Sequence, residues 1–466
     1  MSRRTHAAPR GRGTIDPVGG NARLNDTGLA PRRAALTVLA AIRRGVPFDV
    51  ALERELHQLP DADRRLTHEL AAGVLRHSRS LDALITRFVP RGLGSVSPPL
   101  LDVLRVGAYQ LRLLDRVPPH AAVATSVALA RERVGERVSG FTNAVLRRVA
   151  ELPREIATVP TSTDEPDLAD AAAAARLAQL WSHPAWLVTR WLARFGTRQT
   201  EQLLHWNNSH PRLILQPTRG TNLDLEELLD EHEIPSTPAP FGAGTVVTER
   251  RPDRLPGFDT GEFVVQDPAQ ALVVRFAEFP ADAVVYDACA APGGKTIGIG
   301  GAVRGVVAAD VSRRRVGRLK ENIARAGHGN EWPVVADAAH PPVRPVTGYL
   351  LDAPCLGTGT FARHPDARLR VTPEALMQLA GEQRVLLDAA AARIAPGGVL
   401  CYATCSLEPE ENEMQVAGFL NRHPGFRREP PRAFPGDILT PDGDLLTLPQ
   451  RDGLDGAFAA RLVRRA

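Results

Sequence analysis

The feature that most constrains this chain is a short apolar run that ends in an acid and passes directly into a glycine-rich turn. Residues 283–287 (Ala-Val-Val-Tyr-Asp) predict a β-strand, and a helix is predicted to start near Lys295. Between them lies the turn Ala288-Cys289-Ala290-Ala291-Pro292-Gly293-Gly294. In an open α/β sheet, a nucleoside cofactor lies beside such a first strand–turn–helix, at the carboxyl ends of the strands. The glycines allow the backbone to come close to a ligand.

The turn matches neither of two common phosphate-binding patterns. Gly294-Lys295-Thr296 fits the end of a P-loop, but Cys289 stands where that loop needs glycine, and the turn is not G-x-G-x-x-G. Free N–H groups at a helix start also bind carboxylates. The methionine end of S-adenosylmethionine is therefore one possible ligand. Taken alone, the turn is equally compatible with a structural loop of some other α/β domain.

Four further apolar runs in the C-terminal part of the chain also end in polar or reactive residues. The runs at 306–309, 334–336, 349–351 and 399–403 end at Asp310, Asp337, Asp352 and Thr404-Cys405. Asp352 also begins the sequence Asp-Ala-Pro-Cys, which ends at Cys355. If the strands are parallel, these side chains meet at one edge of the sheet. A single Asp after a strand is more often a turn former, but five strands with the same arrangement favour a shared site.

The spacing of Asp310 gives it a more specific prediction. It follows Asp287 by 310 − 287 = 23 residues, and an acid about 20 residues after the glycine-rich turn is placed to hold ribose hydroxyls. Farther along the chain, Thr372-Pro373 predicts a helix start, and we expect that helix to stop at Pro396-Gly397-Gly398. The run at 457–463 predicts an edge strand.

The 466 residues suggest a multidomain protein. Residues 31–150 have apolar residues at helical spacing, which predicts an all-α domain, and residues 176–262 predict a small α+β adaptor. Residues 263–466 predict an α/β Rossmann-like domain. We interpret residues 1–30 as a disordered basic arm and residues 151–175 as a linker.

Arginine supplies nearly all of the positive charge, since Lys295 and Lys320 are the only lysines, and the formal net charge is +4. Arginine suits phosphate recognition, although genomic base composition explains the overall count equally well. The four cysteines, at 289, 355, 401 and 405, show no disulfide-framework spacing and no metal-ligand set, so we expect reduced thiols and no metal. No apolar run approaches a membrane span and no signal peptide is present. We therefore expect a cytoplasmic protein without a membrane partner. We also expect a monomer.

Two stretches of the predicted helical domain resemble the NusB RNA-binding domain. They are Leu104-Arg105-Val106-Gly107-Ala108-Tyr109-Gln110-Leu111 and the segment from Phe141 to Arg148. The resemblance covers about 120 residues and implies that this domain contacts RNA through its arginines. The alternative is a helical bundle whose arginines form a solvated face.

The C-terminal motifs resemble the RNA 5-methylcytosine methyltransferases of the Nol/Nop/Sun group. The resemblance rests on Asp-Ala-Cys-Ala-Ala-Pro-Gly-Gly-Lys-Thr, Asp-Ala-Pro-Cys, Arg363-His364-Pro365-Asp366 and Ala-Thr-Cys-Ser. It implies a class I methyltransferase domain with S-adenosylmethionine as cofactor. The implied cofactor-binding residues are Cys289, Ala290, Ala291, Pro292, Gly293, Gly294, Lys295, Asp310, Asp337 and Asp352.

The chemistry of cytosine methylation requires a nucleophile, because carbon 5 of cytosine does not accept a methyl group unaided. A thiolate that adds to carbon 6 makes carbon 5 nucleophilic, and both Cys355 and Cys405 are candidates. The resemblance assigns the attack to Cys405, gives Cys355 a role in product release, and implies that Asp352 holds the base. We expect the target cytosine to be extruded from any base stack, and Lys295 is a candidate for activating the thiol.

The combination of domains favours 16S ribosomal RNA as the substrate, by analogy. Two other interpretations remain open: a transfer RNA cytosine-5 methyltransferase, and a non-catalytic RNA-binding assembly factor that uses the helical domain. A complete pair of thiols argues against the second alternative, because a scaffold needs neither of them.

Overall fold

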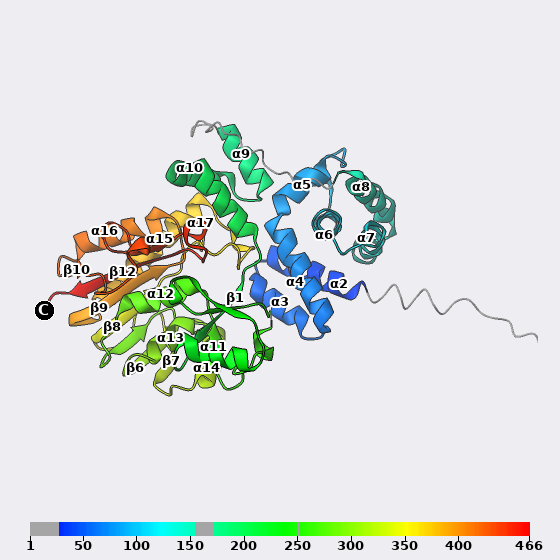
Figure 1. Ribbon diagram of the computed structural model, residues 1–466. Helices are drawn as coiled ribbons and strands as arrows, with labels where there is room; N and C mark the ends of the chain where they lie inside the picture. Colours follow the sequence, from blue (N-terminus) through cyan, green and yellow to red (C-terminus); the bar gives the residue numbers. More distant parts are fainter. Residues whose placement is uncertain (1–27, 154–170, 250) are drawn as a thin grey trace, which may run out of the picture. The chain divides into compact units, whose positions relative to one another are not determined.

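The computed structural model describes residues 28–153 and 171–466, apart from residue 250. The chain divides into two compact units, Met1–Pro160 and Thr161–Ala466 (Figure 1). Most of the expected arm at 1–30 and of the expected linker at 151–175 therefore lies outside the described residues.

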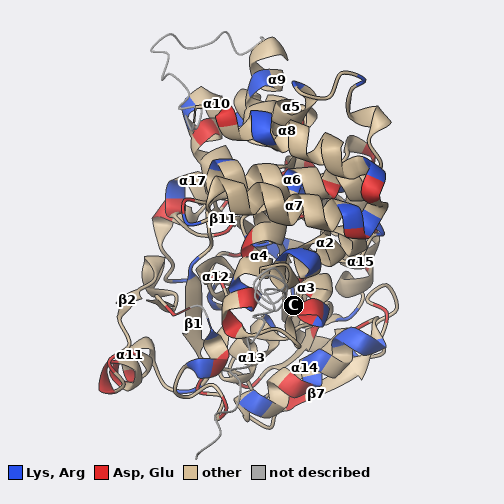
Figure 2. Ribbon diagram, turned by 90° about the vertical axis from the view of Figure 1, so that its right-hand side faces the viewer, with Lys and Arg blue, Asp and Glu red and all other residues tan. Residues whose placement is uncertain are grey.

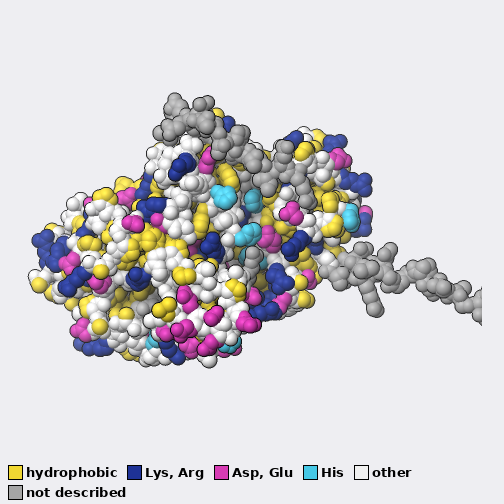
Figure 3. All heavy atoms as spheres, viewed as in Figure 1, with side chains coloured by type: hydrophobic (Ala, Val, Ile, Leu, Met, Phe, Trp, Pro, Cys, Tyr) yellow, Lys and Arg dark blue, Asp and Glu magenta, His cyan; other side chains and the backbone are white. Residues whose placement is uncertain are grey.

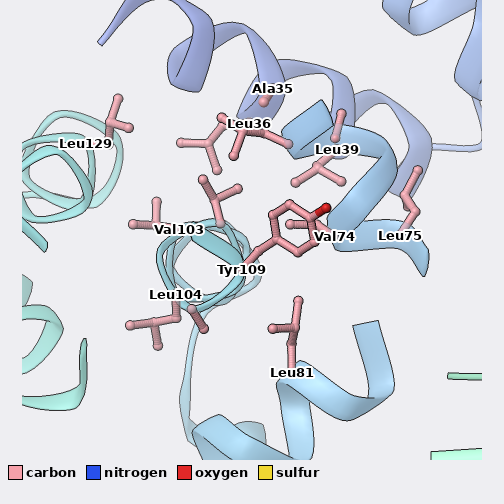
Figure 4. Packing of buried hydrophobic residues seen from close by; sticks show 14 of the residues in the cluster. Ala35, Leu36, Leu39, Val74, Leu75, Leu81, Val103, Leu104, Tyr109 and Leu129 are labelled. Atoms are coloured by element: carbon pink, nitrogen blue, oxygen red, sulfur yellow. The ribbon is translucent and has the colours of Figure 1, made fainter. Parts of the chain in front are cut away.

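The described part of the first unit is helical, as predicted. Its α-helices are α2 (Ala30–Arg43), α3 (Phe48–Leu56), α4 (Asp61–Arg76), α5 (Ser78–Thr86), α6 (Pro98–Leu113), α7 (Pro119–Val134) and α8 (Ser139–Glu151). Helix α6 contacts α2, α4, α5, α7 and α8, so it forms the centre of the bundle. Figure 4 shows its residues Val103, Leu104 and Tyr109 packed among leucines and valines of the surrounding helices. The packing needs glycine at position 73, where a Cβ would lie 2.0 Å from Cζ of Tyr109.

The second unit begins with two helices and a small antiparallel sheet. Helix α9 (Ala171–Leu180) packs on α10 (Ala185–Asn208), and Trp191 of α10 is buried in the core. The small sheet has the order β2-β3-β1-β4 and the helix α11 (Asn222–Glu231). Its strands are β1 (Leu213–Pro217), β2 (Ser236–Pro238), β3 (Thr245–Val247) and β4 (Phe263–Val265). Strand β4 lies just beyond residue 262, the expected end of the adaptor, yet it pairs with β1.

The rest of the second unit is built on one large sheet with the order β10-β12-β9-β8-β5-β6-β7. The parallel strands are β5 (Val284–Asp287), β6 (Gly305–Asp310), β7 (Glu331–Val335), β8 (Val346–Asp352) and β9 (Ile394–Thr404). The antiparallel strands are β10 (Phe426–Arg428), β11 (Leu445–Thr447) and β12 (Ala457–Arg464). The helices are α12 (Pro268–Ala277), α13 (Gly294–Gly300), α14 (Arg313–Ala326), α15 (Pro373–Ala391), α16 (Glu413–Arg422) and α17 (Pro449–Asp452).

The strand order reverses direction beside β5. From β5 the chain proceeds through β6 to β7 on one side, and then crosses to β8 and β9 on the other. Such a reversal opens a crevice at the carboxyl ends of the strands, where ligands of open α/β sheets bind. The predicted fold class, with a helical domain, a small α+β domain and a Rossmann-like domain, is confirmed.

Several predicted elements differ from the structure. The run at 457–463 is not an edge strand, because β12 pairs with β9 on one side and with both β10 and β11 on the other. These two short partners gave little signal in the sequence. Helix α15 ends at Ala391 rather than at Pro396, and β9 already begins at Ile394. Strand β7 ends at Val335, two residues before Asp337.

The exposed face of α11 is strongly acidic. It carries the exposed residues Asp224, Glu227, Asp230 and Glu231. Figure 2 shows the acidic positions of this ribbon in red, and Figure 3 shows acidic side chains gathered in the same region of the surface. Such a face repels phosphates, so any contact of this unit with a nucleic acid must use other surfaces. Within the described residues, no helix is long and apolar enough to cross a membrane.

Candidate active site

The glycine-rich turn is hydrogen-bonded to β6 and to α14. The N–H of Ala290 donates to the carbonyl of Ala309 across 2.9 Å, and Nδ2 of Asn322 donates to the carbonyl of Pro292 across 2.9 Å. Gly293 has φ +113°, and a Cβ at this position would lie 2.8 Å from Leu319. Both observations require glycine there. Helix α13 begins at Gly294, close to the predicted start, but has only seven residues.

Asp310 lies at the end of β6 in a cavity of about 340 Å³. Its Oδ1 accepts from the N–H of Ser312 at 2.8 Å and from Nη2 of Arg315 at 3.0 Å. Its Oδ2 is buried and has no hydrogen-bond partner among the described residues. A buried carboxylate oxygen without a donor is costly, and a ribose hydroxyl would satisfy it.

The remaining walls of this cavity suit a flat apolar group. Val311, Pro354, Val385 and Leu386 line it, together with Cys289 and Asp337. Burial raises the pKa of the Cys289 thiol to about 12, so this cysteine is a neutral wall residue. The cavity therefore offers an acid that could bind a ribose and apolar walls that could hold a base. This combination fits a nucleoside such as that of S-adenosylmethionine.

Asp337 lies in the same cavity but in a different environment. Its side chain is 55% exposed, and its carboxylate accepts from the N–H of Ala339 and from His340. The backbone hydrogen bond, followed by the one from His340, lowers the pKa of Asp337. The structure therefore leaves Asp337 ionised and partly solvated, whereas Asp310 is enclosed.

A larger cavity of about 820 Å³ is lined by most of the glycine-rich turn and shares Cys289 and Arg315 with the first. In it, Nζ of Lys295 donates to Oδ2 of Asp352 across 2.8 Å and also to Gln270. Burial lowers the pKa of Lys295, but the charge of Asp352 and its hydrogen bond raise it by more, so the ammonium stays charged. Asp287 lines the same cavity. Burial raises the pKa of Asp287 to about 7, so this carboxyl is protonated and neutral at low pH.

The two candidate thiols lie in contact. Sγ of Cys355, which follows β8, is 3.3 Å from Sγ of Cys405, which follows β9. Cys405 lines the large cavity with Lys295 and Asp352. The hydrogen bond between the two thiols, followed by burial, raises the pKa of Cys355 well above its usual value, so Cys355 is a neutral thiol. Cys401 lies within β9, where burial raises its pKa to about 12.

The large cavity is also lined by three charged residues that form ion pairs with one another, which the sequence did not predict. Arg363 donates to Asp455 at 2.9 Å and to Asp267 at 2.7 Å, and all three residues line the cavity. Arg363 belonged to a quoted motif, but its partners lie about 90 residues away on either side, where no local signal marks them. Among the described residues, no group of three His, Cys, Asp or Glu side chains could hold a metal ion.

A sheet whose strand order reverses beside a glycine-rich turn, with an enclosed acid at the end of the next strand, has the architecture of a Rossmann-like, nucleoside-binding domain. Models of three protein families match this chain. Residues 277–463 match the family described as 16S rRNA methyltransferase RsmB/F, and residues 29–151 match the NusB family. Residues 183–252 match an RsmF/B-like, ferredoxin-like domain.

Similar proteins span nearly the whole chain. The probable ribosomal RNA small subunit methyltransferase B of Synechocystis sp. is 33% identical over 94% of this chain and 100% of its own length. Ribosomal RNA small subunit methyltransferase B of Pseudomonas putida is 33% identical over 94% of this chain and 99% of its own. The crystal structure of PH0851 has a TM-score of 0.75 and 24% identity, and covers 93% of this chain and 98% of its own. That structure supports the fold alone.

The chain therefore belongs to the RsmB/F methyltransferase family. It is a methyltransferase, and its methyl donor is S-adenosylmethionine. The predicted cofactor, fold and class of enzyme are confirmed, while the roles of the individual site residues stay predictions.

Proposed function

We propose that this protein transfers a methyl group from S-adenosylmethionine to carbon 5 of a cytosine in 16S ribosomal RNA. The observation that carries the proposal is the 3.3 Å contact of Cys355 with Cys405, because Cys405 lines a cavity together with Lys295 and Asp352. The names of the relatives support ribosomal RNA of the small subunit as the substrate. A ribosomal RNA substrate also supports the expected cytoplasmic location, and the expected form is a monomer.

The cofactor would lie in the cavity of Asp310 and the target base in that of Cys405. Asp310 would accept hydrogen bonds from the ribose, and Asp337 would lie beside the adenine. The glycine-rich turn and Lys295 after it would lie against the methionine portion. The bound cofactor supplies an electrophilic methyl group. The protein's task is then to make carbon 5 of the cytosine nucleophilic and to exclude water from the reacting atoms.

In the proposed reaction, the Cys405 thiolate forms a bond to carbon 6 of the extruded cytosine. Electron density moves toward ring nitrogen 3, where the Lys295–Asp352 pair would hold the base and stabilise the developing charge. Carbon 5 then accepts the methyl group. A base removes the carbon 5 proton, and the electron pair of that C–H bond reforms the ring double bond as the bond between carbon 6 and sulfur breaks. Cys355 would act in this release step.

The test is methyl transfer to defined RNA. Purified protein would be incubated with S-adenosylmethionine carrying a tritiated methyl group and with naked 16S ribosomal RNA, assembled small subunits or bulk transfer RNA. Nuclease digestion and chromatography would then identify the labelled nucleoside. We expect label in 5-methylcytidine from 16S ribosomal RNA. Label confined to transfer RNA would show that transfer RNA, and not 16S ribosomal RNA, is the substrate. Label in any other nucleoside would refute the cytosine assignment. Bisulfite sequencing would locate the position.

A further inference from the structure

Each of the two thiols is flanked by residues that a buried polar side chain holds in place. For Cys355, the flanking residues are Pro354 and Leu356. Gln383 of α15 donates from Nε2 to the carbonyl of Pro354 across 2.8 Å. The N–H of Leu356 donates to Oε1 of Glu411 across 3.0 Å. Gln383 and Glu411 are also joined directly, at 3.0 Å.

The residues on either side of Cys405 are both held by Asn412, and Glu411 also forms a side-chain hydrogen bond with Ser406. Oδ1 of Asn412 accepts from the hydroxyl of Thr404 at 2.6 Å. Its Nδ2 donates to the carbonyl of Ser406 at 2.9 Å. The two arms of one amide therefore hold the residues before and after Cys405.

Glu411 ends the 3-10 turn Pro409–Glu411, and Asn412 follows it directly before α16; both side chains are fully buried. The backbone carbonyl of Glu411 also accepts from the hydroxyl of Tyr402, a residue of β9, at 2.6 Å. The dipeptide is thus tied to the strand that ends just before Cys405 and to the loop that contains Cys355. Buried polar groups that are fully hydrogen-bonded restrict a site to one arrangement.

We propose that Glu411 and Asn412 are positioning residues that together set the distance between the two thiols. Glu411, supported by Gln383, places Cys355, and Asn412 places Cys405. Neither residue needs to touch the RNA or the cofactor. The consequence for catalysis rests on the proposed function, but the positioning itself does not, and the two can be tested separately.

The first experiment measures the separation of the thiols without any substrate. The full-length protein is treated with 4,4′-dithiodipyridine, which accepts two electrons and two protons as Cys355 and Cys405 join in a disulfide, and leaves as two molecules of pyridinethione. Peptide mapping by mass spectrometry identifies the bridge and gives its rate of formation. We expect the wild type to form it readily, because its sulfur atoms are 3.3 Å apart.

We expect Glu411→Ala and Asn412→Ala each to slow formation of this bridge at least tenfold. Glu411→Gln keeps an acceptor for Leu356 and should stay within about threefold of the wild type. Glu413→Ala is the matched control, because this neighbouring acid is partly exposed and pairs with Arg194. If an alanine variant does not fold, Asn412→Asp carries the test: it keeps the acceptor for Thr404 but loses the donor to Ser406, and should also be slow. Wild-type rates in the folded variants would overturn the proposal.

The second experiment asks which catalytic step each residue supports. Labelled 16S ribosomal RNA and S-adenosylmethionine are added, and covalent protein–RNA adducts are separated on a denaturing gel. We expect Glu411→Ala to accumulate adduct, as loss of Cys355 would, and Asn412→Ala to form little adduct, as loss of Cys405 would. If both variants form the disulfide slowly but accumulate the same amount of adduct, the positioning role stands. The assignment of Glu411 to product release and of Asn412 to nucleophilic attack would then be refuted. Absence of adduct even when Cys355 itself is replaced would refute the covalent mechanism alone.

Discussion

Lys295, at the start of α13, and Asp352, at the end of β8, form an ion pair with 2.8 Å between Nζ and Oδ2. The pair joins the glycine-rich turn to the strand that leads to Cys355. Both side chains are largely shielded from water, with exposed fractions of 11% and 30%. A pair of this kind contributes to stability mainly because each charge would be costly if it were left alone.

This pair can be tested with a double-mutant cycle. We expect Lys295→Met and Asp352→Asn each to lower the free energy of unfolding by about 1–3 kcal/mol, because each leaves one charge without its partner. The double variant should lose less than the sum of the two. All five tryptophans lie in the second unit, so urea unfolding followed by tryptophan fluorescence reports on this unit. Strictly additive losses would show that the pair is not coupled.

The second prediction compares the two acids of the cofactor cavity. Asp310→Ala removes a buried carboxylate with one free oxygen, and should weaken S-adenosylmethionine binding at least tenfold, or about 1.4 kcal/mol. Asp337→Ala should weaken it only about two- to threefold, because that carboxylate is solvated and already bonded within its own loop. Calorimetric titration gives both affinities. Unchanged affinity in Asp310→Ala would remove this residue from the cofactor site.

The third prediction separates the two thiols. Cys405→Ala should abolish methyl transfer and the covalent adduct, since the nucleophile is missing. Cys355→Ala should still form the bond but release product slowly, so the adduct should accumulate. Denaturing gels with labelled RNA and S-adenosylmethionine show the adduct directly. An adduct in Cys405→Ala with none in Cys355→Ala would reverse the assignment, and full turnover by both variants would exclude a thiol nucleophile.

Much of this site could be predicted because its residues follow strands. The order of apolar runs and polar ends placed Asp310, Asp352 and Cys405 at one edge of the sheet, and the structure has them there. The residues that hold the thiols could not be found in this way. Glu411 contacts Leu356 from 55 positions away, and such a pairing depends on how α15 and the 3-10 turn pack rather than on any local pattern. The small strands β10 and β11 were missed because three residues carry too little periodicity.

The fourth prediction concerns pH and Glu411. Burial raises the pKa of Glu411 to about 7, above the value near 4.3 of an unfolded chain. The folded state therefore binds the proton more tightly, and this contribution to stability is present at low pH and is lost as the pH rises through about 7. Glu411→Gln cannot titrate, so it should gain stability relative to the wild type between pH 5 and pH 8.

The comparison with Glu411→Gln cancels the other buried acids, such as Asp287, whose pKa is also raised to about 7. Each unit of pKa difference corresponds to about 1.4 kcal/mol, and about 1 kcal/mol moves the midpoint of a unit of this size by roughly 2–4 °C. Thermal unfolding at several pH values, followed by tryptophan fluorescence, measures the difference. If the difference in unfolding midpoint between the wild type and Glu411→Gln is the same at every pH in this range, Glu411 does not titrate there.

The last prediction concerns the helical unit. Arg147 and Arg148 are exposed at the end of α8, where they are free of the buried core and accessible to phosphates. If they contact RNA, each releases counterions on binding, and the logarithm of affinity falls with the logarithm of salt concentration by about 0.7–0.9 per contact. Replacing both with alanine should therefore weaken RNA binding and reduce the salt slope by roughly 1.4–1.8. Filter binding at several potassium chloride concentrations measures the slope.

Two controls accompany this measurement. Affinity for S-adenosylmethionine should not change. Arg427→Ala, in strand β10 of the other unit and paired with Glu429, should leave the salt slope as in the wild type. A salt slope equal to that of the wild type would show that these two arginines belong to a solvated face, which the sequence left as the alternative.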